Sequence, residues 1–276
     1  MKLQLIRFHF KVLGAIAPNY AAKRAFTMFQ TVRKKNIRPR EMELFEKARH
    51  FTIFSLDETI DCYELGAENK EIAFLVHGID SNAGSLSKIA FELEKSGKRV
   101  ILFNLPGHAF SPSNKTNIFI CKHAFKTLID TINPQQPFSV YSHSFGSAVT
   151  AYTLANSNIK IDKLVLLSSP NSMEAIFEEF QRIVGLNAKV YQLLGGLAED
   201  ILGQKLTALQ VDKLVPQIDY SELILIHDKH DKVLDFKNSI AIQAKSERSR
   251  IVSLENVGHY KMLWDNNVQQ ELSVLV

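Results

Sequence analysis

The sequence predicts an α/β protein with a mainly parallel sheet. From residue 51 onward, short β-prone runs alternate with helix-length amphipathic stretches, as in parallel strands joined by helical crossovers. Strands are expected at 71–77, 99–105, 138–143, 163–169, 222–228 and 249–255. Helices are expected at 85–97, 119–132, 146–157, 235–246 and 262–274. Sheets of this kind bind ligands at the carboxyl ends of their strands, so functional residues are sought directly after the strands.

Composition fits a soluble globular protein that is long enough to bury a sizeable core. Of the 276 residues, 46% are hydrophobic and 22% are charged. Two cysteines, Cys62 and Cys121, are too few for a disulfide framework or a metal cluster, so we expect packing residues in a reducing, cytoplasmic compartment. No run of 18 apolar residues predicts a transmembrane helix.

The N-terminal segment differs in charge from the rest of the chain. Residues 1–49 carry 12 Lys and Arg against 3 Glu, a net charge of +9, and the remainder carries −5. Helices are expected at 3–17, 20–33 and 40–49, and residues 1–50 are treated as a basic helical extension. Two interpretations stay open. Either these helices pack on the body formed by the rest of the chain, or residues 1–35 make a peripheral contact with an anionic membrane.

Two further segments complete the predicted organisation. Residues 51–56 and 59–65, separated by two acidic residues, predict a hairpin that adds an antiparallel edge to the sheet. Residues 171–219 contain helical stretches at 173–184, 189–197 and 204–214, more than a crossover requires. We therefore expect a helical cap with apolar pocket walls, inserted into a core of residues 51–170 and 220–276.

Residues 137–147 carry the candidate nucleophile, Ser144. A short apolar run leads into Ser-His-Ser-Phe-Gly at 142–146, and a helix-compatible stretch follows. A sharp strand-to-helix turn with small residues on both sides of a serine exposes the serine Oγ at the strand's end, as in a nucleophile elbow. Ser142 stands where this pattern has glycine, so the turn alone leaves a purely structural role open.

A nucleophilic serine needs a base and a group that orients the base. His259 follows the strand expected at 249–255 and is the candidate base. Asp231 follows the strand at 222–228 and is the candidate carboxylate, with Asp228 as a rival that we place in the turn itself. The neighbouring His227 and His230 have no matching ligand set elsewhere, so no metal site is expected.

The oxyanion of an acyl-transfer reaction also needs two N–H donors. They are expected from the residue after the nucleophile, Phe145, and from Ile79 in the loop after the first parallel strand. Gly78 and Gly146 allow close backbone approach at these turns. His77 is expected to structure its loop, and His143 is expected to be structural as well.

Taken together and in order, these stretches resemble the α/β-hydrolase superfamily over residues 51–276. The resemblance depends on His77-Gly78, on Asn-Leu-Pro-Gly-His-Ala-Phe-Ser at 104–111, on 142–146, on 227–233 and on Gly258-His259. It implies an α/β-hydrolase fold with an eight-stranded sheet, a catalytic triad of Ser144, Asp231 and His259, and a cap after the sixth strand. Asn104 replaces the family's aspartate before the Pro-Gly-His turn and Ala109 replaces a glycine, and neither belongs to the triad.

This set of residues predicts transfer of an acyl group to water without a cofactor. The first expectation is a carboxylesterase or lipase-like enzyme that cleaves an ester of an apolar or acyl-chain substrate through an acyl-enzyme on Ser144. A thioesterase, a C–C bond hydrolase or a retired scaffold that binds a ligand remain alternatives. Nucleic acid is not an expected partner, because the basic segment contains no recognised binding module and the body is acidic.

Overall fold

The computed structural model describes residues 3–274 and contains one eight-stranded sheet, in the order β1-β2-β4-β3-β5-β6-β7-β8. The strands are β1 (Arg49–Ser55), β2 (Glu58–Leu65), β3 (Glu71–Val76), β4 (Lys98–Phe103), β5 (Phe138–His143), β6 (Lys160–Leu167), β7 (Asp219–Asp228) and β8 (Ser249–Leu254). The pairs β1–β2 and β2–β4 are antiparallel, and all others are parallel. The predicted α/β fold, with its antiparallel edge, is confirmed.

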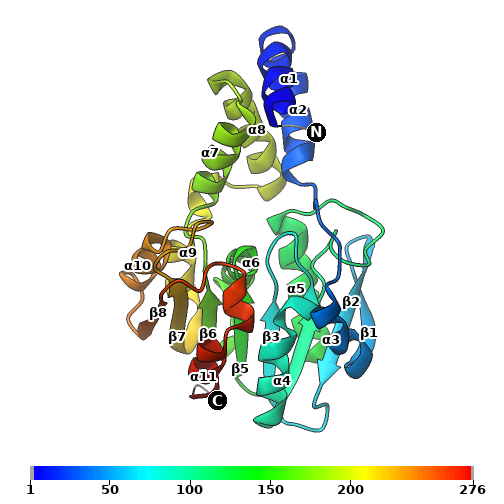
Figure 1. Cartoon of the computed structure of the whole chain (residues 1–276), viewed down its shortest axis with the longest axis vertical. Helices are drawn as coiled ribbons and strands as arrows, with labels where there is room; N and C mark the ends of the chain where they lie inside the picture. Colours follow the sequence, from blue (N-terminus) through cyan, green and yellow to red (C-terminus); the bar gives the residue numbers. More distant parts are fainter. Residues whose placement is uncertain (1–2, 275–276) are drawn as a thin grey trace. The chain divides into compact units, whose positions relative to one another are not determined.

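Helices cover both faces of this sheet. They are α3 (Met42–Lys47), α4 (Ser87–Lys95), α5 (Ile118–Ile132), α6 (Phe145–Leu154), α9 (Val211–Leu214), α10 (Lys237–Gln243) and α11 (Asn266–Val274), with short 3-10 turns at Pro39–Glu41, Ala83–Leu86, Val215–Gln217 and Lys261–Trp264. Helices α4 and α11 lie on one face and α5 and α6 on the other (Figure 1).

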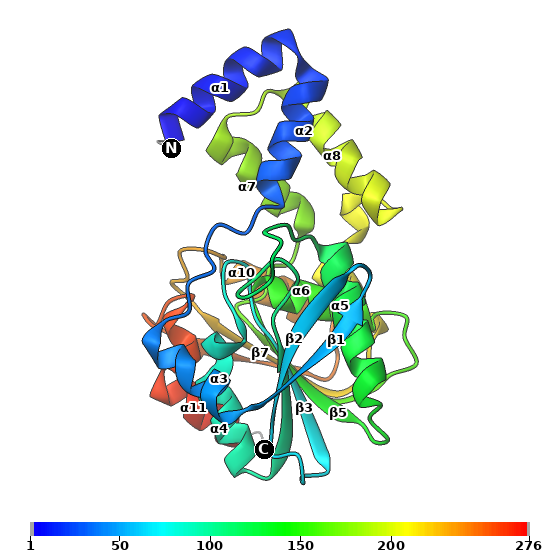
Figure 2. The ribbon, with the colours of Figure 1, turned by 90° about the vertical axis from the view of Figure 1, so that its right-hand side faces the viewer.

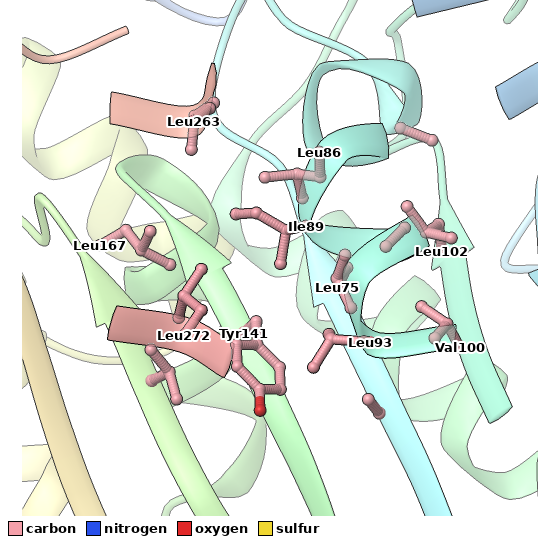
Figure 3. Packing of buried hydrophobic residues seen from close by; sticks show 14 of the residues in the cluster. Leu75, Leu86, Ile89, Leu93, Val100, Leu102, Tyr141, Leu167, Leu263 and Leu272 are labelled. Carbon is pink, nitrogen blue, oxygen red and sulfur yellow. The ribbon is translucent and has the colours of Figure 1, made fainter. Parts of the chain in front are cut away.

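Apolar side chains from alternate strand positions build the core between sheet and helices. On the α4 side, Leu75, Tyr141 and Leu167 of neighbouring strands meet Leu93 of α4 and Leu272 of α11 (Figure 3). All five are at most 2% exposed, and burying a side chain of this size stabilises the fold by about 1.5–3 kcal/mol.

The strand order creates a topological switch point at β3. The chain passes from β3 to β4 on one side, and β5 lies on the other side of β3. Sheets of this kind bind ligands at the carboxyl ends of the strands beside such a point. The predicted nucleophile follows β5 and the predicted oxyanion loop follows β3.

A second compact unit, the helical unit, contains residues 1–31 and 172–210. Its helices are α1 (Leu3–Ile16), α2 (Pro18–Phe29), α7 (Met173–Val184) and α8 (Ala188–Leu202), with a 3-10 turn at Leu206–Ala208. Figure 2 shows α2 beside α8, and the ring of Phe29 lies 4.2 Å from that of Phe177. The N-terminal helices thus pack on the inserted helices.

This division of the chain differs from the one drawn from sequence. The units separate after residues 31, 171 and 210, whereas composition placed the boundaries after 50, 170 and 219. Residues 32–49 belong with the sheet because long-range bonds hold them there, such as that from the Val32 N–H to the Asn114 carbonyl at 2.8 Å. Residues 204–214 form a 3-10 turn and α9 rather than one helix, since Gln210 pairs with Ser172 in an isolated β-bridge.

No helix within residues 3–274 combines the length and apolar character needed to cross a bilayer. Cys62 and Cys121 are both buried and free.

Candidate active site

Ser144 occupies a strained turn between the fully buried strand β5 and helix α6. Its backbone has φ +54° and ψ −123°, a region that L-residues rarely adopt, and its N–H donates to the Leu167 carbonyl at 2.9 Å. Two residues on, Gly146 lies so close to β3 that a Cβ there would be 2.4 Å from the Val76 carbonyl oxygen. The sharp turn therefore depends on a glycine at 146, and it projects Ser144 from the strand end.

The structure brings Ser144, His259 and Asp231 together in one hydrogen-bonded series. His259 Nε2 lies 3.0 Å from Ser144 Oγ, and His259 Nδ1 lies 2.7 Å from Asp231 Oδ2. A carboxylate can only accept, so Nδ1 carries the proton and Nε2 accepts the hydrogen of the serine hydroxyl. Both the imidazole and the carboxylate are buried, which strengthens their interaction.

The Asp231 carboxylate is surrounded by donors. Burial alone would raise its pKa, but hydrogen bonds from His227, His259 and the Leu234 N–H outweigh burial and hold the pKa well below its usual value. Oδ1 accepts from the N–H groups of Val233 at 2.7 Å and Leu234 at 3.0 Å, and Oδ2 also accepts from Ser168 Oγ at 2.9 Å. Asp231 thus remains ionised and fixed in orientation.

Ser168 and His227 were not recognised from sequence as neighbours of this carboxylate. Ser168 directly follows β6, as the other site residues follow their strands, and that position was the available signal. His227 is fully buried near the end of β7, with Nδ1 2.7 Å from Ser239 Oγ and Nε2 2.9 Å from the Leu234 carbonyl. It braces the turn that carries Asp231.

Asp228, the rival carboxylate, holds the loop that leads to His259. Its Oδ2 accepts from the N–H groups of Val257 and Gly258, the latter at 2.7 Å, and its Oδ1 accepts from the His230 N–H at 2.6 Å. Burial would raise the pKa of Asp228, and these backbone donors lower it below its ordinary value. Asp228 acts on backbone, whereas Asp231 contacts the imidazole.

The two predicted oxyanion donors follow β5 and β3. Phe145 is the first residue of α6, so its N–H has no partner within the helix. Gly78 precedes Ile79, and a Cβ at Gly78 would lie 3.1 Å from the Cβ of Ser144, so the two loops are in close approach.

Buried side chains hold the loop that carries Ile79. His77 accepts the Leu105 N–H at Nε2, 2.9 Å away, and donates from Nδ1 to the Gly78 carbonyl at 2.8 Å. Complete burial lowers the pKa of His77 well below its ordinary value. Asp80, in a positive-φ conformation, accepts from the Arg33 N–H at 2.7 Å and from Arg33 Nε at 2.9 Å. The segment after the N-terminal helices therefore braces this loop, which the sequence did not indicate.

His143 supports the position of His259. Its Nε2 donates to the His259 carbonyl at 2.9 Å, and its ring centroid lies 4.8 Å from that of His259. Burial, and to a smaller extent the nearby His259 ring, lowers the pKa of His143 to about 3. His143 is therefore a neutral, internal donor at neutral pH.

Acid should destabilise the fold through His143. The imidazole has an unfolded pKa near 6.5 and a folded pKa of about 3, so the unfolded state binds the extra proton between these values and stability falls as the pH falls. One such group contributes a slope of up to about 1.4 kcal/mol per pH unit. Urea unfolding between pH 6.5 and 4 should show a shallower pH dependence for His143→Gln than for wild type. His9→Gln, at an exposed site, is the control, and an unchanged slope in His143→Gln would contradict the prediction.

Other candidate sites are less suited to chemistry. A cavity of about 380 Å³ is lined by Phe138 and Lys160, at the amino ends of β5 and β6, away from Ser144. Among residues 3–274, no group of three or more His, Cys, Asp or Glu side chains is arranged to hold a metal ion.

Comparison with known proteins agrees with this architecture. A family model for the α/β-hydrolase fold matches residues 74–194, and a search of curated proteins found no match. A bacterial membrane phospholipase A, described as a virulence factor, is 17% identical, with 99% of this chain and 96% of that chain covered and a TM-score of 0.63.

Two further structures are similar to the same degree. Est1E from Butyrivibrio proteoclasticus, solved with ferulic acid, is 13% identical over 82% of this chain and 97% of that chain, with a TM-score of 0.64. An esterase from Pyrococcus furiosus is 16% identical over 87% of this chain and 92% of its own, with a TM-score of 0.62. At these identities the likeness concerns the fold. The family model covers less than half of the chain, so the comparisons together show the α/β-hydrolase fold.

Proposed function

We propose that the chain is a serine hydrolase that cleaves a carboxylic ester of an apolar or acyl-chain substrate. The observation that carries the proposal is the series Asp231–His259–Ser144, with donor–acceptor distances of 2.7 and 3.0 Å, at a strained strand-to-helix turn. Nucleophile, base and orienting carboxylate in this geometry support acyl transfer.

The reaction proceeds in two halves. Ser144 Oγ attacks the ester carbonyl carbon while His259 Nε2 takes its proton, and the resulting oxyanion accepts hydrogen bonds from the N–H groups of Phe145 and Ile79. Collapse of this intermediate breaks the carbon–oxygen bond, and His259 gives the proton to the departing alcohol. Water then attacks the acyl-enzyme, with His259 again as base, and releases the carboxylic acid and Ser144. Asp231 stays ionised and holds His259 in the required tautomer.

An ester with an apolar or acyl part is favoured because the similar structures include a phospholipase A and an esterase from Pyrococcus furiosus. A thioester is the second candidate, because the same steps cleave it and a thioesterase domain from the curacin biosynthetic pathway shares the fold. Rates on p-nitrophenyl esters of increasing acyl length, compared with acyl thioesters of the same lengths, separate the two.

Covalent labelling tests the proposal directly. A fluorophosphonate should modify the native protein once per chain, on Ser144, because only a serine activated by a base attacks phosphorus rapidly. Mass spectrometry of the 142–147 region should locate the label, and the Ser144→Ala variant should remain unmodified. Heat-denatured protein is the matched control, since unfolding separates Ser144 from His259. Absence of both labelling and ester turnover in the native protein would favour the retired scaffold instead.

A further inference from the structure

Helix α1 leaves a continuous apolar stripe uncovered within the helical unit. Leu5, Phe8, Val12 and Ile16 are 57%, 67%, 42% and 78% exposed. Their spacing of three, four and four residues places them within an arc of about 80° on the helix. Four large exposed side chains in one row are unlike the isolated exposed apolar residues that soluble surfaces normally carry.

Packing within the unit uses the other side of α1. Phe10 and Gly14 are its buried residues, and a Cβ at Gly14 would lie 3.1 Å from the Val190 side chain of α8. Arg7 donates from Nε to the Ile183 carbonyl at 2.9 Å, at the carboxyl end of α7. These contacts account for how α1 is held, so the stripe of Leu5, Phe8, Val12 and Ile16 is not needed for that purpose.

The charge around the stripe indicates what covers it. Residues 1–31 contain five Lys and Arg and no Asp or Glu. Lys11, Lys23 and Arg24 are exposed, and within residues 3–274 none of them has an ion-pair partner. On the helix wheel Lys11 borders the stripe. The cationic charge of α1 and α2 is therefore available to an anionic partner.

We propose that α1 lies in the interface of an anionic lipid bilayer, with Leu5, Phe8, Val12 and Ile16 among the acyl chains and Lys11 at the headgroups. An amphipathic helix with large apolar side chains and flanking cations binds membranes in this way, by apolar burial and by attraction to acidic lipid. A second copy of the chain is a poorer occupant, because a symmetric contact through α1 would bring two like-charged surfaces together. The inference concerns docking and is independent of the proposed chemistry.

Vesicle sedimentation of the full-length protein tests the proposal. The protein should sediment with phosphatidylglycerol-containing vesicles, less with pure phosphatidylcholine vesicles, and less at high salt, which screens the cations. The double variant Phe8→Gln/Val12→Gln should bind at least roughly tenfold more weakly, because two large side chains no longer enter the apolar region. Phe54→Gln is the matched control and should leave binding unchanged, since Phe54 is 68% exposed but lies on β1, outside the helical unit.

Each other outcome counts against the proposal. Failure of the wild type to sediment with acidic vesicles, or equal sedimentation of Phe8→Gln/Val12→Gln, would overturn it. The stripe would instead be assigned to a contact with a second copy of the chain if two results were found together. Size-exclusion chromatography would show a wild-type dimer and a monomeric double variant, and neither protein would sediment with vesicles. Circular dichroism distinguishes a folding defect in the double variant from a loss of vesicle binding. Vesicle binding by the Ser144→Ala variant would show that sedimentation does not require hydrolysis.

Discussion

Replacing His259 with alanine should lower kcat for ester hydrolysis by on the order of 10⁵-fold or more. His259 Nε2 lies 3.0 Å from Ser144 Oγ and accepts the hydrogen of the hydroxyl. Without this imidazole, the attacking oxygen keeps its proton. The same imidazole must protonate the leaving alcohol and activate water, so its loss removes both halves of the reaction. Steady-state rates on a p-nitrophenyl ester, with single-turnover labelling by a fluorophosphonate, measure the effect.

His230→Ala is the matched control for this substitution. His230 is exposed and follows the same strand as Asp231, but it bonds to Asp228 through its backbone N–H. We expect its kcat to stay within a few-fold of wild type. If folded His259→Ala keeps a tenth or more of the wild-type kcat, the series at Ser144 is not the base-assisted nucleophile proposed here.

The sheet and the elbow were predictable because their signals are local. Alternation of short apolar runs with amphipathic stretches fixed the eight strands to within a few residues. A serine between a buried strand and a small-residue helix indicated the turn at Ser144. His259 and Asp231 were found by the same rule, since each follows a strand and parallel strands end at one edge.

What the sequence did not indicate depends on contacts between distant segments. Phe29 packs on Phe177, and nothing in the periodicity of either helix identifies its partner. The bond from Arg33 to Asp80 likewise joins a basic run to a loop whose spacing suggested only an oxyanion donor. Nor did the periodicity of α1 show which of its apolar residues pack within the helical unit, because apolar residues lie on both sides of that helix.

The substitution Asp231→Asn should lower kcat by roughly 10⁴-fold while leaving the protein folded. Oδ1 accepts two backbone N–H groups, and Oδ2 accepts His259 Nδ1 and the Ser168 hydroxyl. An amide has one oxygen and one NH₂ group, so in either orientation NH₂ faces a set of donors. His259 then loses its orientation or adopts the tautomer with the proton on Nε2, which cannot accept the proton of Ser144.

The comparison with Asp228→Asn decides which carboxylate serves His259. Asp228 accepts hydrogen bonds from the backbone N–H groups of residues 230, 257 and 258. Replacing its carboxylate with an amide should therefore chiefly loosen the loop that leads to His259. We expect unfolding free energy to fall by about 1–3 kcal/mol, with a much smaller loss of kcat than in Asp231→Asn. Urea unfolding and ester kinetics on both variants give the two readouts. If Asp228→Asn stays folded and loses kcat as far as Asp231→Asn does, the orienting role proposed for Asp231 would have to be shared with Asp228 or reassigned to it.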